Sequence, residues 1–246
     1  MKSAFGRALL LGGLAVSLLA IAIWVFVPRS PRPIPPRPAG ERPTLLLLTS
    51  LPLVFGEDFS IQDHGSPALE ALRKRYKVVS ISVTDPDELK KGGLLLMAQP
   101  IAQPAEDLVA LDRWVEAGGR VLILADPMLE WPSKRPLGDP LRPPAMFMDT
   151  GLLGHWGVRL DAPDRRGEEQ RTLGGFRVLT VSPGRLSGTC RVAPDGLTAH
   201  CRVRKGEVTI VADADLLNVG ELGSGAAYNL DGLLSELASL EALVIR

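Results

Sequence analysis

The sequence has no net charge that would attract a polyanionic partner. Its 246 residues contain 28 lysines and arginines against 28 aspartates and glutamates. Six of the basic residues lie within 1–43, which leaves 22 basic and 27 acidic side chains in residues 44–246. Proteins that bind nucleic acid neutralise phosphates with a surplus of Lys and Arg. The charge balance therefore argues against nucleic acid as a partner.

Recognisable catalytic motifs are also missing. The chain contains no G-x-S-x-G or S-x-x-K sequence, and the glycine-rich stretch 220–226 lacks the spacing of a phosphate loop. The three histidines, His64, His155 and His200, are far apart, and only His200 has a cysteine beside it. A zinc site needs several His or Cys ligands at short spacings. We therefore expect no metal and no cofactor, and the motif search assigns no catalytic residue.

One long apolar run lies near the N-terminus. Ala8 to Val27 contains no charged residue, and Trp24 lies near its end. Twenty such residues can span a bilayer as a helix, and tryptophan is common at the membrane interface. A cleaved signal peptide is the alternative, because Ala20-Ile21-Ala22 fits an A-x-A site, but the apolar run continues beyond it. We favour the first interpretation, an uncleaved transmembrane anchor that comprises residues 1–27.

A proline-rich segment follows the apolar run. Residues 28–43 contain seven prolines, a composition that favours an extended polyproline II spacer before a folded body at 44–246. Two basic residues precede the apolar run and four follow it, a count that would place the body in the cytoplasm. Long domains, however, cross the membrane largely regardless of nearby charge. We expect a single-pass protein of the inner (cytoplasmic) membrane whose main domain is extracytoplasmic.

The stretch from Leu94 to Pro127 predicts a strand, a helix and a second strand. Residues 94–98 and 121–125 are short apolar runs, as expected of strands buried on both faces. Between them, Pro104 suits a first helical turn. An apolar stripe at helical spacing follows, formed by Leu108, Leu111, Trp114 and Val115. Such a unit predicts parallel strands joined by a right-handed crossover.

Similar patterns extend on both sides of this unit. They predict strands at 44–48, 77–83, 157–160 and 207–211, helices starting near Ser66-Pro67 and covering 146–156 and 230–243, and β-structure within 171–204. Alternating strands and helices are typical of α/β proteins. The sequence therefore predicts a doubly wound, mostly parallel, flavodoxin-like sheet with a β-rich insertion around 171–204, preceded by one transmembrane helix.

Polar residues follow several of these strands directly. They are Thr49, Ser50, Gln99, Asp126, Asp213 and Asp215. In doubly wound sheets, ligands bind at the carboxyl ends of the strands, so these residues are candidates for binding a ligand. Carboxylates there can hold a cation. The alternative is structural, because an Asp after a strand often caps a helix or fixes a turn.

The two cysteines flank a strong turn signal, Pro194-Asp195-Gly196. With a two-residue Asp195-Gly196 loop, residues whose numbers sum to 391 face each other, so Cys190 lies opposite Cys201. A three-residue loop would shift the register by one and place the thiols on opposite faces. The two-residue register predicts a disulfide, which suits an exported domain.

Three stretches carry a family resemblance: the TSLPL turn at 49–53, the AQP…LDRWVEAGGRVLILADP unit, and VTIVADADLLN at 208–218. They resemble the auxiliary domain of uncharacterised ABC-type transport systems, a group similar to the gliding-motility auxiliary component. This group has a fold like class I glutamine amidotransferases. The resemblance implies a membrane-anchored accessory domain without demonstrated catalysis, with transporter subunits as partners. The amidotransferase pattern would place a Cys at the turn after residues 94–98, where this chain has Gln99.

Two functional hypotheses follow from these observations. The first is a non-catalytic binding or accessory domain anchored in the membrane, for which the family resemblance implies a transporter as the partner. The second is a divalent-cation-dependent hydrolase that uses Asp126, Asp213 and Asp215 at the carboxyl edge of the sheet.

Overall fold

The computed structural model of the chain describes residues 31–56 and 65–242. Contacts divide the chain into Met1–Arg32 and Pro33–Arg246, and the helices and strands described below belong to the second unit. The anchor expected at 1–27 lies outside the described residues. Within the two described ranges, no helix has both the length and the hydrophobicity needed to cross a bilayer.

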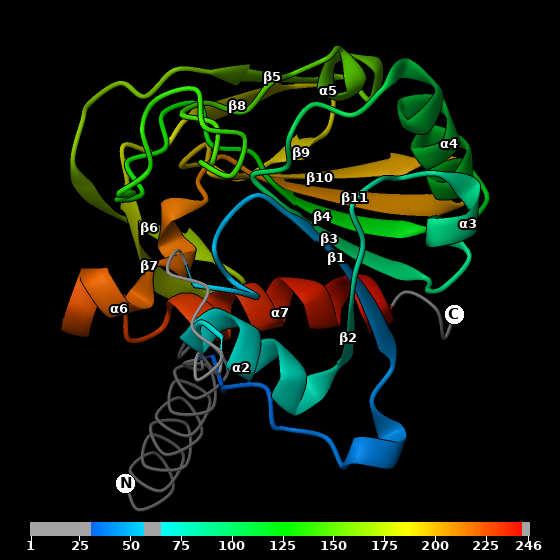
Figure 1. Cartoon of the computed structure of the whole chain (residues 1–246), viewed down its shortest axis with the longest axis horizontal. Coiled ribbons are helices and arrows are strands. Elements are labelled where there is room, and N and C mark those ends of the chain that lie inside the picture. Colours follow the sequence, from blue (N-terminus) through cyan, green and yellow to red (C-terminus); the bar gives the residue numbers. More distant parts are fainter. Residues whose placement is uncertain (1–30, 57–64, 243–246) are drawn as a thin grey trace, which may run out of the picture. The chain divides into compact units, whose positions relative to one another are not determined.

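A central sheet has the strand order β2-β1-β3-β4-β11-β10-β9 (Figure 1). Its strands are β1 (Thr44–Thr49), β2 (Lys77–Ser80), β3 (Leu94–Ala98), β4 (Arg120–Leu124), β9 (Arg191–Val192), β10 (Thr198–Val203) and β11 (Gly206–Val211). The first five strands in this order pair in parallel, whereas β10 is antiparallel to both β11 and β9. The prediction of an α/β fold with a mostly parallel sheet is confirmed.

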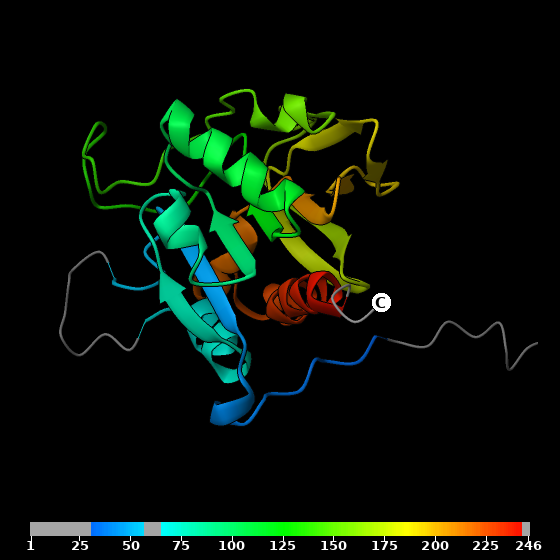
Figure 2. The same ribbon diagram turned by 90° about the vertical axis from the view of Figure 1, so that its right-hand side faces the viewer.

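Helices cover both faces of this sheet (Figures 1 and 2). Side chains alternate between the two faces of each strand, so every buried strand contributes to two apolar layers. In β1, Leu45 and Leu47 pack in one layer with α2 (Pro67–Arg75) and α7 (Asn229–Ala242). Leu46 and Leu48 pack in the opposite layer with α3 (Pro86–Leu89) and α4 (Ala105–Glu116). Burial on both faces explains why the strands are continuous apolar runs.

Two helices begin where side chains cap them. The Ser66 hydroxyl accepts a hydrogen bond from Leu69 N (3.1 Å) before α2, as the Ser66-Pro67 pair predicted. The carboxylate of Asp85 accepts from the backbone N–H groups of Asp87 and Glu88, and this cap starts α3. The sequence predicted a strand up to residue 83. The strand instead ends at residue 80, and the short helix α3 follows it.

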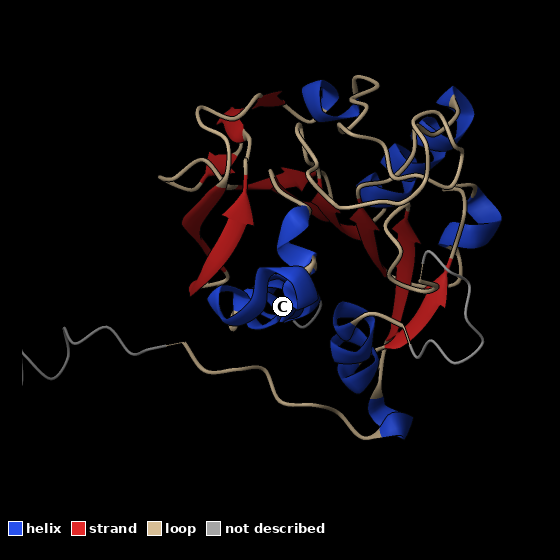
Figure 3. Ribbon diagram, turned by 60° about the vertical axis from the view of Figure 1, so that its left-hand side comes forward, coloured by secondary structure: helices blue, strands red, loops and turns tan. Residues whose placement is uncertain are grey.

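The chain between β4 and β11 carries the added β-structure (Figure 3). It contains α5 (Leu152–His155) and two antiparallel pairs, which are β5 (Val158–Asp161) with β8 (Arg185–Gly188) and β6 (Glu168–Leu173) with β7 (Phe176–Val181). This β-structure begins before residue 171, and its last strands, β9 and β10, extend the central sheet. Of the helix expected at 146–156, only the last turn forms, as α5. Met146 and Met148 are exposed, so the first part has no core contact that would hold it in a helix.

Short helical turns complete the described structure. They are η1 (Ala39–Glu41), η2 (Asp215–Leu217), α6 (Val219–Leu222) and η3 (Gly223–Ala226). The last three connect β11 to α7, so the chain returns from the carboxyl end of β11 to the layer that α7 shares with α2.

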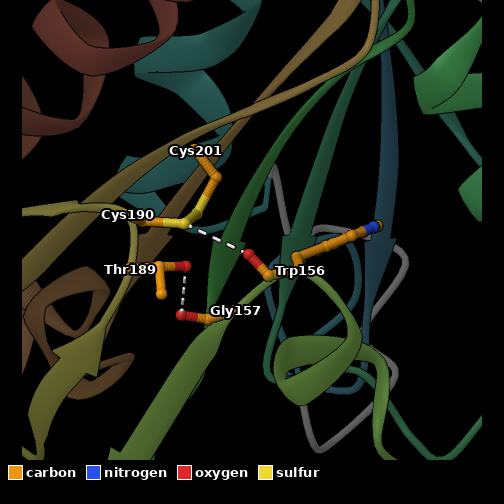
Figure 4. The surroundings of a disulfide bond; sticks show 5 residues. All are labelled: Trp156, Gly157, Thr189, Cys190 and Cys201. Carbon is orange, nitrogen blue, oxygen red and sulfur yellow. Dashed lines mark hydrogen bonds between the residues drawn. A yellow bond between two sulfur atoms is a disulfide. The ribbon is translucent and has the colours of Figure 1, made fainter.

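The hairpin of β9 and β10 has the predicted register. His200 faces Arg191 and Ala199 faces Val192, so the numbers of facing residues sum to 391. Cys190 and Cys201 form a disulfide with their Cα atoms 4.9 Å apart (Figure 4). The loop is longer than predicted, because Ala193 N donates to Thr198 O (2.8 Å) and residues 194–197 form the turn. Two extra loop residues leave the facing pairs unchanged, which is why the disulfide prediction is confirmed.

Part of the proline-rich segment contacts the folded body. Ile34 packs against the layer under α2 and α7, and Arg37 N donates to Lys74 O (3.0 Å). The carboxylate of Glu241 in α7 accepts from Arg37 Nη1 (2.6 Å) and from the Tyr76 hydroxyl (3.3 Å). Residues 34–37, which the sequence assigned to an extended spacer, thus connect the ends of α2 and α7.

Two tryptophans that pack on the same apolar layer should differ in their contribution to stability. Trp156 is 6% exposed and its Nε1 donates to Asp112 Oδ1 (2.8 Å), whereas Trp114 is half-buried. We expect Trp156→Ala to lower the free energy of unfolding by about 3–5 kcal/mol and Trp114→Ala by about 1–2 kcal/mol, in proportion to the area that each side chain buries. Urea unfolding followed by circular dichroism measures both. A larger loss for Trp114→Ala would contradict this assignment of burial.

Candidate binding site at the carboxyl edge of the sheet

The residues that end β1 hold the neighbouring strand β3. The Thr49 hydroxyl donates to Ala98 O (2.9 Å) and accepts from Leu51 N (3.0 Å). The Ser50 hydroxyl donates to the backbone oxygen of Gln99. Both predicted candidates therefore lie at the expected edge, and their hydroxyl groups tie two adjacent strands together.

Gln99 continues this link from β3 to β4. Its backbone has φ 44°, in the left-handed region that residues other than glycine rarely adopt, and its side chain is buried. The amide oxygen accepts from Asp126 N (3.0 Å), and Nε2 donates to Asp126 O (3.2 Å) and Pro144 O (3.1 Å). The side chain therefore pairs with the backbone of Asp126 and fixes the loop that follows β4.

Asp126 carries the link across to β11. One carboxylate oxygen accepts from Met128 N (2.8 Å), and the other accepts from Ala214 N (2.8 Å) and Asp215 N (3.4 Å). Burial raises the pKa of Asp126 to about 6, although these three backbone N–H groups oppose the shift. The carboxylate thus joins the loop after β4 to the turn after β11.

Asp213 and Asp215 are buried and bind other backbone segments. Asp213 accepts from Leu216 N (2.7 Å) with one oxygen and from Val181 N (2.9 Å) with the other. Asp215 accepts from Glu130 N (2.7 Å). Burial raises the pKa of Asp215 to about 7, and burial together with the neighbouring carboxylates raises that of Asp213 well above its usual value.

These contacts favour a structural role for the three carboxylates. Each one accepts hydrogen bonds from the backbone N–H groups of a neighbouring loop, as capping carboxylates do. Across residues 31–56 and 65–242, no group of three or more His, Cys, Asp or Glu side chains is arranged to hold a metal ion. The predicted candidates therefore lie together at one edge of the sheet, but the carboxylate oxygens accept hydrogen bonds from the chain's own backbone.

The accessible cavity at this edge lies beside β1 and β2. It has a volume of about 430 Å³, which is within the usual range for small-molecule sites. Its polar lining consists of Thr49, Ser50, Ser80, Ser82 and Arg135, and the apolar lining includes Leu51, Val54, Phe55, Ile81, Ile101 and Leu141. Of the six candidates from the sequence, only Thr49 and Ser50 line this cavity.

The sequence missed Ser80 and Ser82 for a specific reason. A strand drawn to residue 83 places both serines inside it, whereas β2 ends at residue 80. The rule that ligands bind after the carboxyl ends of strands would have selected them if the boundary had been correct. Arg135 has no such signal, because it comes from the long irregular loop after β4.

Comparison with known proteins connects the N-terminal half of the body to a family. Residues 42–163, from β1 to β5, match the family model of an ABC-type uncharacterized transport system. The match covers slightly less than half of the chain and supports the resemblance inferred from the sequence. No functionally curated protein matches the chain in sequence.

Solved structures resemble the fold at low identity. The mmIFT52 N-terminal domain is 12% identical, with a TM-score of 0.55 over 80% of this chain and 97% of that domain. An exo-beta-1,4-mannosidase from Opitutaceae bacterium strain TAV5 is 14% identical, with a TM-score of 0.46 over 81% of this chain and 36% of the enzyme. The chain thus spans about a third of the length of this glycosidase. These similarities concern the fold alone, and they do not confirm the expected likeness to glutamine amidotransferases.

The raised pKa of Asp215 predicts an unusual dependence of stability on pH. Because the folded-state pKa of about 7 exceeds the ordinary 3.8, this carboxyl stabilises the fold at low pH, and the contribution is lost as pH rises toward 7. Asp215→Asn keeps an acceptor for Glu130 N and removes the charge. We expect the variant to gain about 1–3 kcal/mol of unfolding free energy at pH 8 and almost nothing at pH 4.

Denaturant unfolding at the two pH values measures this difference. The matched control is Asp87→Asn, because Asp87 is an exposed carboxyl whose pKa is lowered by Lys90. The control should show no gain at pH 8. A loss of stability in Asp215→Asn at pH 8 would mean that the fold needs the charged carboxylate.

Proposed function

We propose that this chain is a membrane-anchored accessory component of an ABC-type transport system, and that its α/β domain binds a partner instead of catalysing a reaction. The match of residues 42–163 supports the connection with transport. One observation supports a role without catalysis. Backbone groups of the chain itself form hydrogen bonds with the side chains at this edge, which are Gln99, Asp126, Asp213 and Asp215.

The strand order supports binding at the carboxyl edge. The parallel strands β2-β1-β3-β4-β11 follow the order 2-1-3-4-5 of flavodoxin-type sheets, in which the order reverses between the first and third strands. Ligands of such sheets bind outside the carboxyl ends of the strands at this reversal. Thr49 and Ser50 lie there and line the cavity of about 430 Å³.

The exposed apolar side chains around this cavity support a protein partner. Phe55, Ile101 and Leu141 line it and are 66%, 53% and 58% exposed. Large apolar side chains that cluster on a surface commonly mark an interaction site. A subunit of the transporter with a complementary apolar segment would cover them.

The disulfide supports an extracytoplasmic body. Cys190 and Cys201 are bonded, and such bonds are rare in the reducing cytosol. Together with the apolar run at 8–27, this bond supports a short cytoplasmic N-terminus, a single anchor in the inner membrane and an exported domain.

We expect full-length protein to remain in carbonate-washed membranes and to co-purify from mild detergent with the membrane-spanning and ATP-binding subunits of a transporter. Leu141→Glu should abolish this association because it places a charge on the apolar rim of the cavity. Val109→Glu is the control, since Val109 is a comparably exposed residue (49%) on α4 that does not line the cavity. Mass spectrometry of the purified material identifies the partners.

Two outcomes would contradict the proposal. Release of the intact protein by carbonate would exclude the anchor, because burial of twenty apolar residues far exceeds surface attachment. Equal retention of transporter subunits by both variants would exclude the cavity rim as the contact.

The competing function, a divalent-cation-dependent hydrolase, makes a different prediction. A cation bound to Asp126, Asp213 and Asp215 must raise the melting temperature, because it binds the folded state preferentially. We expect millimolar Mg²⁺, Ca²⁺ or Mn²⁺ to leave the melting temperature of the full-length protein unchanged, since these carboxylates already accept backbone hydrogen bonds. Differential scanning fluorimetry measures this, with Na⁺ at equal ionic strength as the control. A saturable rise that Asp126→Asn removes would favour the hydrolase.

A further inference from the structure

A second cavity lies between α7 and the antiparallel end of the sheet. Its volume is about 410 Å³, and its walls come from β9, β10, β11, α7 and the turn between β6 and β7. Residues from these elements include Arg191, His200, Thr209, Glu236 and Gly174. We call it the β9–α7 pocket. None of its lining residues takes part in the edge site described above, so an inference about this pocket is independent of the proposed transporter role.

The sheet register places three of these side chains in a row. Arg191 faces His200 across the β9–β10 pair, and His200 faces Thr209 across the β10–β11 pair. Facing residues in antiparallel strands project from the same side of the sheet with their Cβ atoms about 5 Å apart. The pocket floor therefore presents a guanidinium, an imidazole and a hydroxyl side by side.

The disulfide holds this row in place. Cys190 directly precedes Arg191, and Cys201 directly follows His200. Neighbouring side chains in a strand point to opposite faces of the sheet. The disulfide therefore lies on the face opposite the pocket, where it links β9 to β10. β9 is only two residues long and has few ladder hydrogen bonds of its own, so the covalent link fixes where Arg191 sits.

Two acidic and two basic side chains line the pocket, namely Glu207 and Glu236 with Arg191 and His200. Glu236 is 6% exposed, and its two oxygens contact Gly174 N (3.0 Å) and His200 Nε2 (2.9 Å). At the rim, Glu207 pairs with Arg202 (3.7 Å). Within the described part of the chain, Arg191 has no ion pair or hydrogen bond. Arg191 is exposed on a strand whose backbone the disulfide restrains, and a guanidinium at the edge of a concave site can bind an oxyanion through two of its N–H groups.

We propose that the β9–α7 pocket binds a small molecule that carries a carboxylate or phosphate group. Arg191 receives the oxyanion, Thr209 adds a hydroxyl donor beside it, and the His200–Glu236 pair forms the adjacent wall. The volume admits a molecule of metabolite size. The disulfide pre-organises the cation, so the site should weaken when the bond is removed.

Melting temperatures of the full-length protein in detergent, titrated with inorganic phosphate and separately with acetate, test the proposal. Ionic strength is held constant with chloride. We expect a saturable rise with one or both anions, and the anion that gives it distinguishes a phosphate-bearing from a carboxylate-bearing ligand. Arg191→Gln should weaken the apparent affinity at least tenfold. Arg73→Gln, which removes one exposed positive charge from α2 without lining the pocket or pairing with its glutamates, should leave it within twofold.

Several outcomes would overturn the proposal. Absence of saturation with both anions, or equal weakening by the two Arg variants, would mean general screening of charge. The variant that replaces both cysteines by Ser should bind several-fold more weakly than the oxidised protein. Unchanged affinity in that variant would overturn the role of the disulfide. If that variant does not fold, the two Arg variants, both in the oxidised protein, still decide whether the site exists.

Discussion

The fold depends on buried polar ties that run across the carboxyl ends of its parallel strands. Ser50 binds the backbone of Gln99, Gln99 binds that of Asp126, and Asp126 binds that of Ala214 and Asp215. A loop that leaves a buried strand exposes backbone groups that must find partners, because an unpaired buried N–H costs about 1–3 kcal/mol. In this protein side chains supply those partners. The same need explains the buried acids with raised pKa values, because their oxygens accept hydrogen bonds from backbone N–H groups and do not line the cavity at this edge.

Much of the fold could be predicted from the sequence. The strand at 94–98, the helix that follows and the strand at 120–124 were readable because both strands are buried on two faces and the helix on one. The assignments failed where tertiary contacts decide. Met148 lies at helical spacing from Leu152, but Met146 and Met148 are both exposed and do not pack on the core, so their segment does not form a helix. The hairpin of β9 and β10 was predicted in the correct register, but its loop is longer than the predicted two residues.

The candidate site shows the same division. Positions after parallel strands could be predicted to meet at one edge, and they do. Their partners could not be predicted, because the N–H groups that Asp213 and Asp215 bind come from Val181 at the end of β7 and from Glu130 in the loop after β4, far away in the chain. A sequence shows that a carboxylate ends a strand. It does not show whether the carboxylate oxygen faces a cavity or another part of the chain. In this protein that difference decides between a cation-binding site and a structural hydrogen bond.

The disulfide has a consequence for the register of the hairpin. A slip of one strand by one residue against the other would exchange the two faces of that strand. The thiols would separate, and either Arg191 or His200 would move to the opposite side of the sheet. The bond between Cys190 and Cys201 excludes this slip, so the oxidised protein keeps both side chains on the face of the pocket even though β9 is only two residues long.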